Sequence, residues 1–267
     1  MSQNLKGTLI LTLTAVIWGS AFVAQAAGAD AVGPFTFNAS RNIMAALFLV
    51  LLITWRHTGT SPFAYGTAVT NFKAHWLPGL YLGLVLFLGE ALQQGGISLY
   101  PAHVASAGRS GFLTSLYVVI VAIVSWLLGR TRSWLIALAV VLSLVGLYLL
   151  CFAHGLHGIY WADLLSFACA FFYAAHIIVI DHYLGYDSLY LSLIQFITAG
   201  FCAGIVMIMV EPVTLSHCLH ALVPMMYAGI MSSGIAYTLQ IIGQKYAEPV
   251  SAALAMSLEA VFAALLG

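Results

Sequence analysis

Two apolar stretches that each contain one charged residue decide how this chain folds: GLYLGLVLFLGEALQQGG (79–96) and GRSGFLTSLYVVIVAIVSWLLG (108–129). Glu90 lies in the middle of the first stretch, and Arg109 lies near the start of the second. On insertion scales, a charge at the centre of a membrane-spanning helix costs about 2.5–3.5 kcal/mol, and such residues are usually functional. We therefore expect the rest of the chain to be the scaffold that holds these charges.

The composition excludes a soluble domain. Of the 267 residues, 63% are hydrophobic and 6% are charged, whereas soluble domains have about 25% charged residues. A net charge of zero leaves no basic face for nucleic acid. The four cysteines lack the spacing of a metal site, and no phosphate-binding loop for ATP is present. The sequence predicts a membrane protein without cofactor or metal, whose partners are lipid and a small solute. It leaves open whether the protein forms a homodimer.

The apolar residues are grouped into runs that are long enough to cross a bilayer, which needs about 20 residues. The runs cover residues 7–27, 34–55, 76–97, 104–128, 133–152, 160–180, 189–210, 222–243 and 250–267. The first run is longer than the roughly 7–15 apolar residues of a secretory signal. We therefore count it as a span and predict an all-α polytopic membrane protein.

The basic residues between the spans predict the orientation. If Lys6 is cytoplasmic, every other lysine and arginine outside the spans is cytoplasmic too: Arg56, Lys73, Arg130, Arg132 and Lys245. Cytoplasmic loops are enriched in Lys and Arg. This distribution predicts a protein of the plasma (inner) membrane of a bacterial cell, with the N-terminus in the cytoplasm.

The chain contains an internal repeat. The similar runs are AVIWGSAFVA (15–24) with AFFYAAHIIV (170–179), GEALQQGG (89–96) with GIAYTLQIIG (234–243), and TSLYVVIVAIVSWLLG (114–129) with MSLEAVFAALLG (256–267). These runs place Gln93 opposite Gln240 and Tyr117 opposite Glu259. Each unit has five spans, and an odd number inverts the second unit relative to the first, as in many secondary transporters. We expect units at 1–153 and 154–267, the second without its last helix, so that about nine of ten expected helices are present.

Four runs together resemble the EamA-type branch of the drug/metabolite transporter superfamily. They are WGSAFVAQAAG (18–28), GPFTFNASRNIMAAL (33–47), AGRSGFLTSLYVVIV (107–121) and SLEAVFAALLG (257–267). The resemblance implies a ten-helix bundle with a central substrate cavity between its halves, and gradient-driven solute movement by alternating access. It does not name a substrate, because members of the family differ in what they carry.

Three buried charges lie at similar depth. With a rise of about 1.5 Å per residue, Arg41, Glu90 and Arg109 all fall in the outer half of the membrane. One interpretation is a cluster of net charge +1 that binds a carboxylate or phosphate of the solute, with Glu90 able to take up a proton. The alternatives are that Glu90 only neutralises one arginine and locks two helices, or that Arg41 extends to the headgroups.

Other polar residues in the spans are candidates to line a solute pathway. Gln93 shares a helical face with Glu90, and Gln240 does so with Tyr237. Glu259 lies near the midplane and is a second proton-coupling candidate. His176 is a third, because histidine can relay protons, although a buried histidine more often serves packing. The full set is Trp18, Arg41, Glu90, Gln93, Arg109, Tyr117, Tyr237, Gln240 and Glu259.

One enzyme hypothesis competes with transport. Residues 108–111 match the Gly-x-Ser-Gly signature of rhomboid-type intramembrane proteases, with Ser110 as nucleophile and His176 as its base. The rise per residue places His176 far below Ser110 in the membrane, so we do not expect an enzyme. The sequence favours a secondary transporter that moves a small metabolite, such as an amino acid or a related polar solute. Export is the expected direction, and proton coupling through Glu90 or Glu259 is an option.

Overall fold

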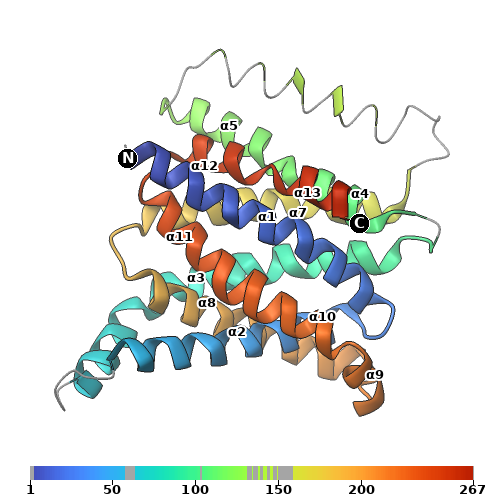
Figure 1. Cartoon of the computed structure of the whole chain (residues 1–267), viewed down its shortest axis with the longest axis horizontal. Helices are drawn as coiled ribbons and strands as arrows, with labels where there is room; N and C mark the ends of the chain where they lie inside the picture. Colours follow the sequence, from blue (N-terminus) through green and yellow to red (C-terminus); the bar gives the residue numbers. More distant parts are fainter. Residues whose placement is uncertain are drawn as a thin grey trace.

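The computed structural model describes residues 3–57, 64–102, 104–130 and 159–266, together with residues 134, 138, 141, 142, 145, 146 and 149. These parts of the chain are helical and contain no strand (Figure 1). Eight helices are long and apolar enough to cross a membrane, and they correspond to eight of the predicted spans. The remaining predicted span, 133–152, lies largely outside the described residues.

The helices of the first half are α1 (Gln3–Ala29), α2 (Pro34–His57), α3 (Ala64–Leu99), α4 (Ser106–Ser115) and α5 (Tyr117–Leu127). Those of the second half are α7 (Trp161–His182), α8 (Ser188–Val210), α9 (Leu215–His220), α10 (Leu222–Met226), the π-helix η2 (Tyr227–Tyr237), α11 (Thr238–Gln244), α12 (Pro249–Met256) and α13 (Glu259–Leu266). Pro34 and Pro249 are the first residues of their helices, where proline's missing N–H costs no hydrogen bond.

The surface of the bundle is apolar and much of its interior is polar. Large side chains such as Leu51, Phe201 and Ile208 are 69, 69 and 79% exposed. Arg41 and Glu90 are only 2 and 1% exposed. Exposed apolar side chains next to buried charges are what lipid as the surrounding solvent requires, and the predicted class of polytopic membrane protein is confirmed.

The second half is inverted relative to the first. The start of α1 is held by a hydrogen bond from Lys6 Nζ to Tyr246 Oη (3.2 Å), and the end of α7 lies at the same end of the bundle, where Arg130 pairs with Asp181. The two repeat-related helices α1 and α7 therefore run in opposite directions (Figure 1). This is the antiparallel relation that an inverted repeat predicts.

The two halves are packed into each other. Helix α3 of the first half packs on α7 and α8 of the second half. The repeat counterpart of α3 consists of η2 and α11. Both of these pack on α1 of the first half, and η2 also packs on α2. Each of these contacts between the halves thus occurs a second time with the roles of the two halves exchanged, as approximate two-fold symmetry requires. The core of the molecule therefore lies at the interface between the halves.

Helices are interrupted at matching positions of the two halves. The α4–α5 span is broken at Leu116, and the α12–α13 span is broken at Ser257 and Leu258. The residues that follow the breaks are Tyr117 and Glu259, which the sequence repeat places opposite each other. Interrupted helices at the repeat interface mark the solute site in many inverted-repeat transporters.

Candidate functional site

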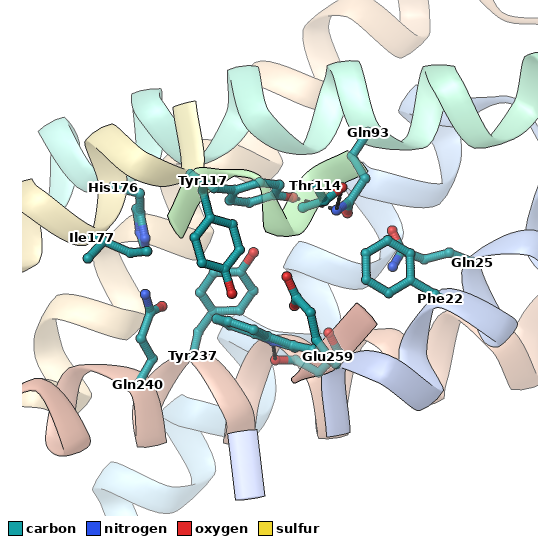
Figure 2. Close-up of a pocket in the computed structure, with 13 residues that line it drawn as sticks. Phe22, Gln25, Gln93, Thr114, Tyr117, His176, Ile177, Tyr237, Gln240 and Glu259 are labelled. Carbon is teal, nitrogen blue, oxygen red and sulfur yellow. Dashed lines mark hydrogen bonds between the residues drawn. The ribbon is translucent and has the colours of Figure 1, made fainter. Parts of the chain in front are cut away.

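A cavity lies in the interior between the two halves (Figure 2). Its lining comes from α1, α3, α4, α5, α7, η2, α11 and α13: Trp18, Phe22, Gln25, Gln93, Thr114, Tyr117, Tyr173, His176, Ile177, Ser232, Tyr237, Gln240 and Glu259. All of these residues are buried except the half-buried Trp18. The cavity volume of about 30 Å³ leaves room for about two water molecules.

Tyr117 and Glu259 face each other across this cavity (Figure 2). They come from the two interrupted spans, and their side chains are 2 and 3% exposed. Within the described part of the chain, neither the Tyr117 hydroxyl nor Glu259 Oε1 has a hydrogen-bond partner besides the other. A single phenol leaves a buried carboxylate under-satisfied, which is costly, so this arrangement suits a site that is completed by a proton or a bound group.

A hydrogen-bond chain runs along the side of the cavity from which Tyr117 projects (Figure 2). The Tyr173 hydroxyl donates to Gln93 Oε1 (3.1 Å), and Gln93 Nε2 donates to the Thr114 hydroxyl (3.2 Å). These bonds join α7 to α3 and α4, so helices of both halves hold the wall in place.

The aromatic side chains are positioned by contacts between α1, α7 and η2. Trp18 Nε1 donates to the Ser232 carbonyl (3.3 Å), and the rings of Trp18 and Tyr237 lie 4.7 Å apart between centroids. His176 packs edge-on against Tyr237 at 5.7 Å and bonds to Gln195 Oε1 at 3.0 Å. The imidazole therefore has a fixed place at the edge of the cavity.

The Arg41–Glu90 ion pair lies in the interior next to this site. Arg41 Nη2 is 3.1 Å from Glu90 Oε1, and Asn42 Nδ2 donates to Glu90 Oε2 (2.7 Å). The Arg41 guanidinium also donates to Ser233 Oγ (3.1 Å) and to Gln25 Oε1 (3.3 Å). Glu90 thus neutralises Arg41, as one alternative reading of the sequence had it. Arg41 does not extend to the headgroups.

The predicted single cluster of three charges is wrong in one member, Arg109. Its Nε and Nη2 donate to the two carboxylate oxygens of Asp163 at 2.6 and 2.7 Å, and the Tyr100 hydroxyl donates to Asp163 Oδ1 at 2.7 Å. Tyr100 lies just beyond its span, and burial together with this bond raises the pKa of the phenol. Depth along the membrane normal predicted a shared height for the three charges. It could not predict the direction in which each helix presents its side chain.

Arg109 also lies away from the cavity. It lines a separate groove between α4 and α13, together with small residues such as Gly108, Ala260 and Ala264. Three of the predicted pathway residues, Arg109, Arg41 and Glu90, are not part of the cavity lining. The cavity lining includes the other candidates, which are Trp18, Gln93, Tyr117, His176, Tyr237, Gln240 and Glu259.

The two residues of the protease alternative each bond elsewhere. Ser110 Oγ bonds to Ser166 Oγ at 3.1 Å, while His176 Nε2 bonds to Gln195. A serine nucleophile needs its base within about 2.6–3.2 Å, and this pairing is not formed. The enzyme reading is therefore not favoured.

The sequence interpretation missed several lining residues. Phe22 and Gln25 follow Trp18 by four and seven residues on α1, the spacing of one helical face, so periodicity could have found them. Thr114 and Ser232 carry no such signal, because small hydroxyl residues are common in helix packing within membranes.

The fold and the interior cavity define a class: polytopic helical membrane proteins built from an inverted repeat around a central site. The sequence model of the EamA-like transporter family matches residues 5–152 and 160–267. The chain therefore belongs to the EamA-like transporter family. The matched ranges lie on either side of the unit boundary predicted at residues 153 and 154, and the boundary itself stays a prediction.

One relative agrees with this assignment, and one solved structure shares the fold. An uncharacterized transporter of Archaeoglobus fulgidus is 34% identical over 185 residues, which are 68% of this chain and 51% of that protein. The chain thus spans about half the length of this relative. A protein solved by crystallography aligns with a TM-score of 0.69 at 18% identity, over 98% of this chain and 86% of its own. That likeness shows the shared fold.

Proposed function

We propose that this protein is a secondary transporter that carries a small metabolite, an amino acid or a related polar solute, through the cavity between its halves. The observation that carries the proposal is the place of the cavity. It lies where interrupted helices of both halves bring Tyr117 and Glu259 together. Polar side chains buried at the interface of an inverted repeat are the usual solute site of such folds.

The small size of the cavity supports alternating access. A volume of about 30 Å³ is far below the roughly 300–1,000 Å³ of typical ligand pockets. A solute can therefore enter only if helices move apart. In this proposal the structure represents an occluded form, and the cavity opens to one side of the membrane at a time.

Ion pairs and caps at both ends of the bundle are candidates for the closing contacts. At one end, Arg56 pairs with Asp187 at 2.9 Å. At the other end, Glu211 of the second half accepts hydrogen bonds from the Phe35 and Thr36 amides of α2 at 2.8 and 2.7 Å. Both contacts join the halves, so either could break when the corresponding end opens.

The ends of the bundle differ in charge, which supports the proposed orientation. Lys6, Arg56, Arg130 and Lys245 lie at one end, where they contact Tyr246, Asp187, Asp181 and the Tyr186 carbonyl respectively. Excess basic charge marks the cytoplasmic side. We propose a plasma-membrane protein with its N-terminus in the cytoplasm. Export as the direction stays a prediction.

Glu259 is the favoured proton-coupling residue among the candidates. Glu90 is already paired with Arg41, and His176 is bonded to Gln195. Glu259 instead faces the cavity, and its partner there is the neutral Tyr117 phenol, not a charged group. It can therefore exchange a proton without breaking an existing ion pair.

The proposal is tested by uptake into proteoliposomes that contain the full chain. Labelled amino acids, purine bases, small organic anions and amines are supplied with and without a proton gradient. Gln240→Ala removes a polar side chain from the cavity. Thr54→Ala is the matched control, because Thr54 is exposed on α2 and bonds only within its own helix. We expect at least one solute to accumulate, with Gln240→Ala impaired and Thr54→Ala unaffected. No accumulation above empty liposomes for any solute would contradict the proposal.

A further inference from the structure

The cavity combines aromatic rings with one carboxylate. Five of the lining residues are phenylalanine, tyrosine or tryptophan: Trp18, Phe22, Tyr117, Tyr173 and Tyr237. Glu259 is the one acidic residue of the lining, and none of the described lining residues is a lysine or arginine. Aromatic faces attract cations within about 6 Å of the ring centroid, and a carboxylate does so more strongly. The lining is thus chemically suited to positive charge.

The arginines that could have bound an anion are engaged elsewhere. Arg41 pairs with Glu90 in a fully buried contact, and Arg109 pairs with Asp163 through two hydrogen bonds. Breaking a buried pair leaves an uncompensated charge and costs about 3–5 kcal/mol. A solute carboxylate would have to meet this cost, whereas a cation meets none at Glu259.

The unpaired polar atoms of the cavity also favour a cation. Gln240 Oε1 is buried and makes no hydrogen bond to described residues, and buried Glu259 Oε1 has only the Tyr117 phenol as a partner among them. A carboxylate oxygen and an amide oxygen are acceptors only, and a phenol oxygen can accept as well. An ammonium group has donors and no acceptor, so it can donate to the carboxylate or to the amide oxygen.

We propose that the solute is a small organic cation, an amine with an apolar or aromatic body, and that it exchanges with a proton at Glu259. This inference rests on the proposed function and narrows its substrate class. When the ammonium binds, the Glu259 carboxyl releases one proton; when the ammonium leaves, the carboxylate takes one up. The site keeps the same net charge in both states, which avoids an unpaired charge in the interior.

Other titratable groups around Glu259 do not compete for this role. Tyr117 of α5, Tyr237 of η2 and Cys169 of α7 face it, and His176 of α7 lines the same cavity. The side chains that α1 and α4 contribute to the lining are Trp18, Phe22, Gln25 and Thr114, which do not titrate. Among these neighbours, only Glu259 carries a carboxylate that an ammonium can neutralise.

The test uses a series of compounds that share one body and differ in charge. They are phenylethylamine, phenylalanine, phenylpropionate and phenylethanol: a cation, a zwitterion, an anion and a neutral molecule. Binding to the detergent-purified full chain is measured by calorimetry, and proton release by a pH-sensitive dye in weak buffer. Uptake of labelled phenylethylamine is then measured in proteoliposomes against empty liposomes.

The variants separate the carboxylate from general damage. Glu259→Gln removes the charge and Glu259→Asp keeps it. Glu248→Gln makes the same change at an exposed residue outside the cavity. We expect wild type and Glu248→Gln to bind the cation and to release about one proton per protein. Glu259→Gln should bind at least about tenfold more weakly, a loss of about 1.4 kcal/mol, without proton release, and Glu259→Asp should retain the release.

Each other outcome is decisive. Stronger binding of the anion, the zwitterion or the neutral compound than of the cation would overturn the inference, as would undiminished cation binding in Glu259→Gln. Binding of none of the four compounds would overturn it as well. Glu259-dependent cation binding without uptake above empty liposomes would keep the cation site but contradict the proposed transport.

Discussion

The Arg41 guanidinium and the Glu90 carboxylate form a 3.1 Å ion pair in the interior, with exposed fractions of only 2 and 1%. This pair joins α2 to α3, and Arg41 also bonds to η2 and α1 through Ser233 and Gln25. It therefore ties four helices from both halves together next to the cavity. The pairing explains how two charges can be buried in a strongly apolar chain, because each charge compensates the cost of burying the other.

Removing one member of this pair should destabilise the protein more than removing both. Glu90→Leu leaves the Arg41 charge buried without its counter-ion, which should cost about 3–5 kcal/mol. In Arg41→Met/Glu90→Leu no charge remains, so we expect a large part of the stability to return. Thermal unfolding of the wild type, Arg41→Met, Glu90→Leu and the double variant in detergent gives the double-mutant cycle. A double variant as unstable as the sum of the single variants would show that the pair is not coupled.

The Glu211 cap should protect the start of α2. Glu211 accepts from the Phe35 and Thr36 amides and from the Thr36 hydroxyl. Loss of a helix cap costs about 0.5–2 kcal/mol, so Glu211→Ala should speed amide hydrogen exchange in the first turn of α2. Thr214→Ala is the matched control, because Thr214 caps α9 instead. Equal protection of α2 in both variants would refute the cap.

The Arg109–Asp163 pair should behave as a local clamp between α4 and α7. Hydrogen bonds to charged groups are worth about 1.5–3 kcal/mol, and either single alanine variant should lose stability in this range. The exchange Arg109→Asp/Asp163→Arg should restore part of it. Ser110→Ala, one residue away, removes a neutral bond to Ser166 and should cost about 1 kcal/mol. Exchange variants no more stable than the single ones would argue against the clamp.

Close packing of α3 on α8 depends on Gly83. A Cβ atom there would lie 2.5 Å from Thr198 Cβ and 2.6 Å from the Gln195 carbonyl oxygen, whereas one at Gly204 would meet nothing within 4 Å. Overpacking typically costs about 1–3 kcal/mol. Gly83→Ala should thus lower the unfolding temperature, and Gly204→Ala should not. Similar shifts for the two variants would mean that the close approach is not required.

Several features could be predicted from the sequence because they depend on composition and period. Apolar runs of sufficient length identified the spans, and the internal repeat paired Tyr117 with Glu259 and Gln93 with Gln240. All four residues line the cavity. Matched polar positions in an inverted repeat lie near the symmetry axis, so the repeat itself carried the information about the site.

Other features depend on tertiary contacts that the sequence does not state. Asp163 is 54 residues from Arg109, and only the direction in which α4 and α7 present these side chains brings them together. The π-helical segment η2 changes the rotation of the chain by local backbone hydrogen bonding. This altered rotation determines which residues of 227–237 face the interior. The spacing of apolar residues in the sequence does not show that the segment is π-helical.

The central claim, that the cavity is a solute site reached from both sides of the membrane, is tested most directly at Ser232. This residue lines the cavity and is 2% exposed. A Ser232→Cys variant without other cysteines would be treated with a membrane-impermeant thiol reagent in right-side-out and inside-out vesicles. The account predicts labelling from either side, slowed by the transported solute. Labelling from one side only, or no effect of the solute, would contradict alternating access through this cavity.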